Sequence, residues 1–192
     1  CLAVWRRVEF LPGTPTDPVW RAEEEAWQAG YTVYPTPPRS PTAAHRTHAW
    51  GRDNMSLITW NDQLSVGINQ IDEEHKKLVQ LINGLHDHML AGDAKEILGK
   101  VLDRIIQYTA LHFGTEEKLM QQYAYPAAVA HFAEHKKLVN TALDLQKKFN
   151  AGSHAITMET MTFLRDWLQH HIRESDKALG RFLATKGEAA HA

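Results

Sequence analysis

The chain has 192 residues, of which 43% are hydrophobic and 23% charged, a composition typical of a globular protein with one ordinary domain and spare length at an end. A net charge of -2 gives no reason to expect nucleic acid or an anionic membrane as a partner. The single cysteine, Cys1, excludes an internal disulfide and thiolate metal ligation, and no apolar run approaches the ~20 residues of a membrane-spanning helix, so a soluble cytoplasmic protein is expected.

Residues 1–54 are predicted to form a mostly irregular, poorly ordered extension. Seven of the eight prolines lie there, and proline lacks the amide donor that regular structure needs: Pro12, Pro15, Pro18, Pro35, Pro37, Pro38 and Pro41. The first methionine is Met55, which suggests the hypothesis that the natural product starts there and that an over-extended reading frame supplies the rest. The alternative is a tether or docking segment whose tryptophans contact a partner: Trp5, Trp20, Trp27 and Trp50.

Residues 55–186 are predicted to form one all-α domain, followed by a tail at 187–192. An arm from Asn61 to Gln70 contains Gly67 and scattered polar residues, which do not support a long helix. Four amphipathic segments follow: about 72–90 with Asp72 as N-cap, about 94–122, a third that Pro126 opens, and about 157–182.

The inward faces of these segments follow steps of three and four residues, as the core face of a helix does. The expected seams are His75, Leu78, Ile82, Leu85 and Met89; Ile97, Val101, Ile105, Tyr108, His112, Glu116 and Leu119; His131, His135, Leu138, Ala142, Leu145 and Phe149; and Met161, Leu164, Leu168 and His171. Short connections around Gly92, Tyr123–Tyr125 and Gly152 make successive helices antiparallel neighbours. The sequence therefore predicts an up-down-up-down antiparallel four-helix bundle with an N-terminal arm.

Seven candidate metal ligands lie on or near these seams: His75, His112, Glu116, His131, His135, His171 and Asp176. Imidazoles buried in a core need polar partners, and a four-residue step stacks two side chains on one helix face. His112 with Glu116 and His131 with His135 have that step. His171 and Asp176 are five residues apart, roughly 140° around a regular helix, so both reach the centre only if the helix kinks or contains a π-type turn. Five imidazoles and two carboxylates suit a pair of iron ions.

From about Ile58 to Phe182 the chain resembles the hemerythrin family of non-haem di-iron oxygen-binding proteins. The resemblance rests on the segments Trp60–Ile68 and Ile71–His75, on His112-Phe113-Gly114-Thr115-Glu116-Glu117, on His131-Phe132-Ala133-Glu134-His135, and on Trp167–Ile172 with Asp176. No ligand position of the family pattern is missing. Residues 1–54 match nothing in it.

The resemblance implies a role for each donor. One iron would be held by His131, His135 and His171, the other by His75 and His112, with Glu116, Asp176 and an oxo or hydroxo group bridging both. The second iron then has one imidazole fewer, which leaves a position for dioxygen. Trp167 and Leu168 would wall the oxygen pocket.

Several simpler readings compete at single residues. Glu117 could replace Glu116 as the ligand, although only Glu116 keeps the four-residue step from His112. His170 points about 100° away from His171 and is expected to face solvent. Glu74 and Glu134 are read as ordinary solvated charges beside buried histidines. Histidines outside the pattern are expected on the surface: His45, His48, His86, His88, His154 and His191.

The function implied is reversible dioxygen binding in oxygen transport or storage, without catalytic activity, by a monomer whose protein recipient the sequence does not identify. An oxygen or redox sensor using the same centre is the alternative. Di-iron enzymes of the carboxylate class have fewer imidazoles in their sites, and a single tetrahedral zinc ion uses fewer ligands than seven.

Overall fold

The computed structural model describes residues 56–153 and 155–187, so the predictions for residues 1–54, for His154 and for most of the C-terminal tail fall outside the described residues. The elements in order are η1 (Asp62–Leu64), α3 (Asn69–Leu90), α4 (Lys95–Gln122), α5 (Ala128–Asn150), α6 (Met158–His171), η2 (Ile172–Asp176) and α7 (Lys177–Ala184). No strand occurs among them.

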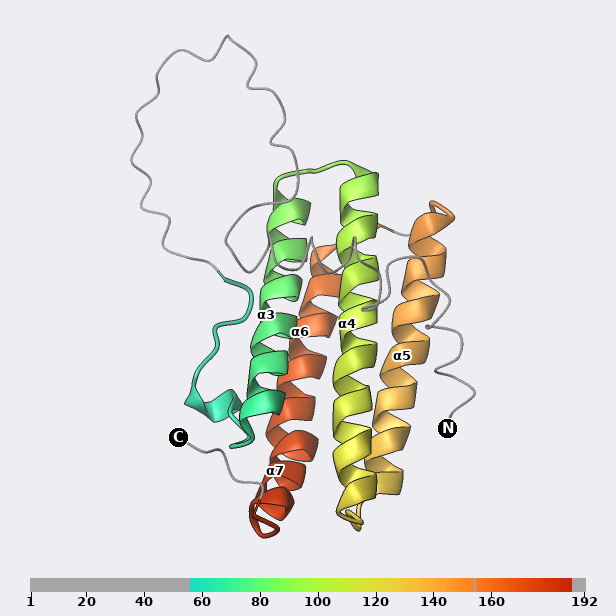
Figure 1. The fold of residues 1–192 in the computed structure, drawn as a ribbon. Helices are drawn as coiled ribbons and strands as arrows, with labels where there is room; N and C mark the ends of the chain where they lie inside the picture. Colours follow the sequence, from blue (N-terminus) through green and yellow to red (C-terminus); the bar gives the residue numbers. More distant parts are fainter. Residues whose placement is uncertain (1–55, 154, 188–192) are drawn as a thin grey trace, which may run out of the picture. The chain divides into compact units, whose positions relative to one another are not determined.

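These elements form the predicted up-down-up-down four-helix bundle. α3, α4 and α5 are three of its helices, and α6, η2 and α7 run on as the fourth (Figure 1). The connections lie at alternating ends of the bundle, and α3 packs against both α4 and α6 (Figure 1). Within the described ranges, no helix has the length and apolarity that a membrane crossing requires.

The core contains residues of the predicted seams and others beside them. Leu85 and Met161 of the seams are completely buried, and Leu102 and Leu179, which the seams did not include, are at most 1% exposed. The outermost seam residues Met89 and Ile97 are only half-buried, because they lie near the helix ends where fewer neighbours cover them.

The start of α3 differs from the prediction. The helix begins at Asn69, with Ile68 as N-cap, so Asp72 lies inside the first turn. The Asp72 carboxylate instead accepts hydrogen bonds from Ser65 Oγ at 2.6 Å and from the Val66 amide at 2.7 Å. Asp72 thus fastens the arm to the helix, a role that local capping patterns do not reveal.

The arm and the residues just before it are tied to the bundle at two further places. The Asn83 side chain accepts from the Ile58 amide and donates to the Ile58 carbonyl, both at 2.9 Å. Near the other end, Val66 packs so closely on Gly180 of α7 that a Cβ there would lie 2.2 Å from the Val66 carbonyl oxygen. The arm also contacts η2 through η1, and so supports the one irregular part of the fourth helix.

Candidate metal centre

The fourth helix contains a π-helical turn, η2, between His171 and Asp176. A regular α-helix would place these two side chains roughly 140° apart. The wider turn brings them to one side, where His171 Nε2 lies 3.1 Å from Asp176 Oδ1. Of the two alternatives left open by the sequence, a kink or a π-type turn, the structure contains the π turn.

All seven candidate donors are buried, with 0 to 3% of their surface exposed, and they meet in one layer of the bundle. They fall into two groups, and within each group the donor atoms lie within 4.8 Å of one another. The first group is Glu116, His131, His135, His171 and Asp176. The second group is His75, His112, Glu116 and Asp176. Glu116 and Asp176 belong to both groups. The first group therefore has three imidazoles and the second has two.

The imidazole nitrogens and carboxylate oxygens of the layer lie close to one another. His131 Nε2 lies 3.1 Å from Asp176 Oδ1, and His135 Nε2 lies 3.1 Å from Glu116 Oε2. In the second group, His75 Nε2 lies 3.1 Å from Asp176 Oδ2. Yet His75 Nε2, His112 Nε2 and the four carboxylate oxygens of Glu116 and Asp176 find no well-directed hydrogen bond. Since unpaired buried polar atoms destabilise a core, these atoms call for a partner at the points where they converge.

The distances between three imidazole nitrogens also indicate a metal ion. The Nε2 atoms of His135 and His171 lie 3.1 Å apart, and those of His131 and His171 lie 3.2 Å apart. Two ligands at right angles on one ion, each about 2.1 Å from it, would be about 3.0 Å apart. The donor set thus fits metal ions, and the residues present match the pair of irons that the sequence predicts.

The carboxylates and imidazoles of the layer also perturb one another. Burial opposes charge on His131, but its close contacts with the Asp176 and Glu116 carboxylates outweigh burial and raise the pKa of His131 to about 9. For His112 too, burial is outweighed, by the charge of Glu116 and the hydrogen bond to Glu74, and its pKa is raised. Burial acts against ionised Glu116, yet His112 and the close contacts with His131 and His135 hold its pKa well below the usual range. His171 shifts the other way, since burial lowers its pKa.

These shifts predict how the metal-free protein responds to alkali. A histidine whose pKa is raised by folding stabilises the fold below its ordinary pKa of 6.5 and loses that contribution as pH rises through its folded pKa. The free energy of unfolding, measured with urea on chelator-treated protein, should therefore fall between pH 6.5 and about 9, as His131 and His112 lose protons. Constant or rising stability across this interval would contradict the expectation.

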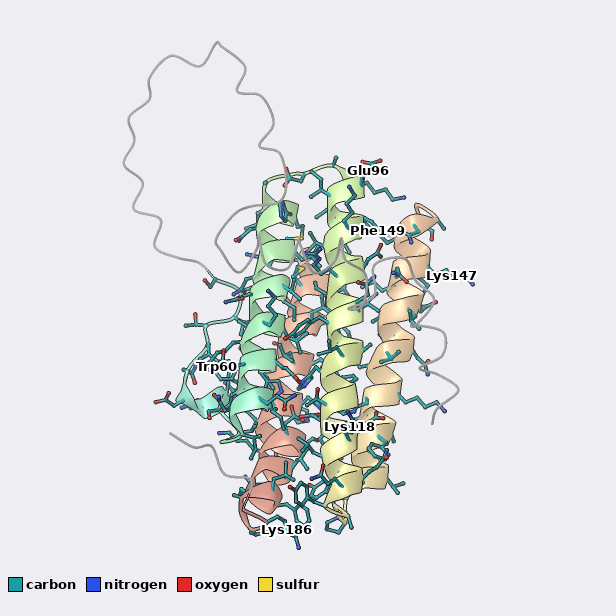
Figure 2. All side chains as sticks on the ribbon, viewed as in Figure 1. Trp60, Glu96, Lys118, Lys147, Phe149 and Lys186 are labelled. Atoms are coloured by element: carbon teal, nitrogen blue, oxygen red, sulfur yellow. The ribbon has the colours of Figure 1, made fainter. Side chains whose placement is uncertain are left out.

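Aromatic rings cover the layer. Trp167 stacks on His171 with ring centroids 4.5 Å apart, and Leu168 beside it is buried. Phe113, which the sequence reasoning did not single out, stacks on His135 at 3.6 Å with an interplanar angle of 5°. Just before the arm, the Trp60 ring lies 6.4 Å from the His75 ring, and Figure 2 shows it beside α3. A dry, apolar surround of this kind strengthens electrostatic interactions with a bound ion.

Glu74 is not the solvated charge that the sequence suggested, and Glu134, although its side chain is exposed, pairs with a buried histidine. Glu74 is 8% exposed and accepts a hydrogen bond from His112 Nδ1 at 3.0 Å. Glu134 accepts one from His171 Nδ1 at 2.8 Å. Glu117, the alternative to Glu116, faces His135 Nδ1 at 3.3 Å instead of the centre. The sequence feature that could have identified these carboxylates is that each is the immediate neighbour of a candidate metal ligand.

The remaining histidines follow the prediction in part. His170 is exposed, as expected. His86 is 6% exposed, so its placement on the surface was wrong: it follows Leu85 on the edge of the α3 core face. His88 is half-buried and its Nδ1 lies 2.6 Å from Asp93 Oδ2 at the end of α3.

Comparison with known proteins places these features in context. A family profile described as "Hemerythrin HHE cation binding domain" matches residues 66–183. Bacteriohemerythrin of Methylococcus capsulatus is 42% identical over 131 residues, which cover 68% of this chain and 99% of that protein. Bacteriohemerythrin of Stenotrophomonas maltophilia is 35% identical, over 65% of this chain and 80% of that protein. A crystal structure of wild-type hemerythrin superposes with a TM-score of 0.64 at 40% identity, over 67% of this chain and 98% of that one.

Proposed function

Because this chain belongs to the hemerythrin family, whose members bind oxygen at a di-iron centre, we propose that it binds dioxygen reversibly for transport or storage. The observation that carries the proposal is the unequal pair of donor groups, with three imidazoles in one and two in the other around two shared carboxylates. An octahedral ion in the second group has one position fewer filled by protein.

The ligand assignment is part of the same proposal. His131, His135 and His171 would hold one iron, His75 and His112 the other, with Glu116, Asp176 and an oxo or hydroxo group bridging. When bound, a pair of ferrous ions supplies the electrons for reversible reduction of dioxygen. The protein's own part is to hold the donors in one layer and to exclude water with Phe113, Trp167 and Leu168. Five of the seven donors are imidazoles, whereas the sites of di-iron enzymes of the carboxylate class are richer in carboxylates, which favours a carrier over an enzyme.

The test is optical and uses the iron-loaded protein. Reduced protein should gain a visible charge-transfer band on exposure to oxygen and lose it on deoxygenation, over repeated cycles. Irreversible oxidation of the irons on exposure to oxygen, without that band, would contradict a carrier and favour the sensor. Iron per chain, measured on the same sample, shows whether both ions are present.

Replacement of one donor tests the assignment. His112→Ala should leave the bundle helical and lower iron content toward one ion per chain, because His112 belongs to the second group alone. Metal analysis and circular dichroism measure the two effects. His170→Ala is the matched control, since His170 is an exposed histidine of the fourth helix and should keep full iron content. Unchanged iron in His112→Ala would refute its role.

A further inference from the structure

We infer that three carboxylates outside the donor layer, Glu74, Glu117 and Glu134, are positioning residues that orient the iron-facing histidines of the neighbouring helices. We call them the outer carboxylates. Glu74 of α3 accepts from His112 of α4, Glu117 of α4 accepts from His135 of α5, and Glu134 of α5 accepts from His171 of α6. In each case, the carboxylate of one helix accepts a hydrogen bond from a histidine of the next helix along the chain.

Helix geometry explains how each of these carboxylates reaches a neighbouring helix. Each outer carboxylate is the sequence neighbour of an inward donor, as in Glu74-His75, Glu116-Glu117 and Glu134-His135. A step of one residue rotates a side chain by about 100°, from the bundle centre to the flank of the helix. At the flank it meets the adjacent helix, where the Nδ1 atom of the next histidine lies.

The hydrogen bonds select one tautomer. An ionised carboxylate only accepts, so the facing Nδ1 atom must carry the proton and Nε2 is left with a lone pair. For His135 and His171 this directs two lone pairs at each other across 3.1 Å. Such an arrangement is unfavourable unless a cation lies between them. The outer carboxylates therefore set the histidines in the form that a metal ion needs before the ion arrives.

Two of the outer carboxylates, Glu74 and Glu134, are themselves held in place. Glu74 also accepts from Thr115 Oγ1 at 3.0 Å and from Gln70 Nε2 at 3.2 Å. Glu134 accepts from Ser175 Oγ at 2.7 Å, and Ser175 lies in the π turn beside Asp176. A freely rotating surface glutamate would not have these partners.

The arrangement is unequal around the layer. The Nδ1 atoms of His75 and His131 are buried and have no hydrogen-bond partner within the described part of the chain. Given the ligand assignment of the proposed function, on which this inference rests, Glu74 supports one iron through His112. Glu117 and Glu134 support the other through His135 and His171.

The test uses the iron-loaded protein and the variants Glu74→Gln and Glu134→Gln, which keep size and remove charge. We expect each to release iron to a ferrous chelator about 10- to 100-fold faster than wild type. Mössbauer spectra of isotopically enriched protein resolve the two irons, so Glu74→Gln should alter one quadrupole doublet and Glu134→Gln the other. A purely structural role would alter neither selectively.

Controls come from the same segments. Glu73→Gln changes an exposed carboxylate of α3 whose ion-pair partner is Lys76, and Glu174→Gln changes an exposed carboxylate of η2. Both should match wild type. If Glu74→Gln fails to fold, Glu134→Gln decides, because the Glu134 side chain is 48% exposed and tolerates the change. Wild-type release rates and doublets in Glu134→Gln would overturn the inference. Wild-type protein that binds fewer than two irons would contradict the proposed function instead.

Discussion

Replacing Glu116 by alanine should remove most of the iron from the protein. Glu116 belongs to both donor groups, and its oxygens lie 3.1 Å from His135 Nε2, 3.4 Å from His131 Nε2 and 3.8 Å from His112 Nε2. Loss of Glu116 therefore weakens the binding of both ions, whereas loss of a histidine from one group weakens mainly the binding of one ion. Iron per chain after gel filtration measures the effect, and the expected order is wild type, then His112→Ala, then Glu116→Ala.

The matched control is Glu96→Ala in the first turn of the same helix. Glu96 is exposed, and Figure 2 shows it at the far end of α4 from Lys118. This variant should keep the iron content of wild type. Full iron in Glu116→Ala would mean that the carboxylate is not shared between two ions, and the bridging role would have to be abandoned.

Replacing Gly180 by alanine should destabilise the fold by about 1–3 kcal/mol, the usual cost of overpacking a tight contact. The added methyl would lie 2.2 Å from the Val66 carbonyl oxygen, 3.1 Å from its carbon and 3.2 Å from its Cβ. Backbone cannot swing aside as a side chain can, so the arm and α7 must separate. Urea unfolding of the iron-free and iron-loaded protein measures the loss.

Gly84→Ala in α3 is the corresponding control. A Cβ at Gly84 would meet nothing within 4 Å, and alanine is favoured over glycine inside a helix by roughly 0.5–1 kcal/mol. This variant should therefore be slightly more stable than wild type. Equal stability of both variants would show that the arm can move away from Gly180 at Val66 without loss of folding free energy.

Much of this architecture can be read from the sequence because its signals are local. Apolar steps of three and four define the helices, and short connections leave few ways to pack them. The same periodicity placed His112 with Glu116 and His131 with His135 on inward faces, and all four are at most 3% exposed. The five-residue gap before Asp176 even indicated where the fourth helix departs from regularity.

Features that depend on contacts between distant segments were not predictable in this way. Asp72 resembled a helix cap, but its partners are Ser65 and Val66 of the arm. Glu74 and Glu134 resembled solvated charges, and only the neighbouring helix shows what they bind. His86 became buried because the core face of α3 is wider than a single seam. Periodicity fixes the face of a residue, whereas its partner depends on the register between helices.

The π turn has a consequence for insertions and deletions in the fourth helix. Before it, Leu164 and Leu168 face the core, and after it Leu179 and Leu183 are completely buried. Removing one residue between His171 and Asp176 would leave a four-residue step, which a regular α-helix places on one face. The acidic group would stay at the centre and the two leucines would stay covered. A deletion at another point of the helix would instead turn everything beyond it by about 100°, so tolerance to the loss of one residue should be highest here.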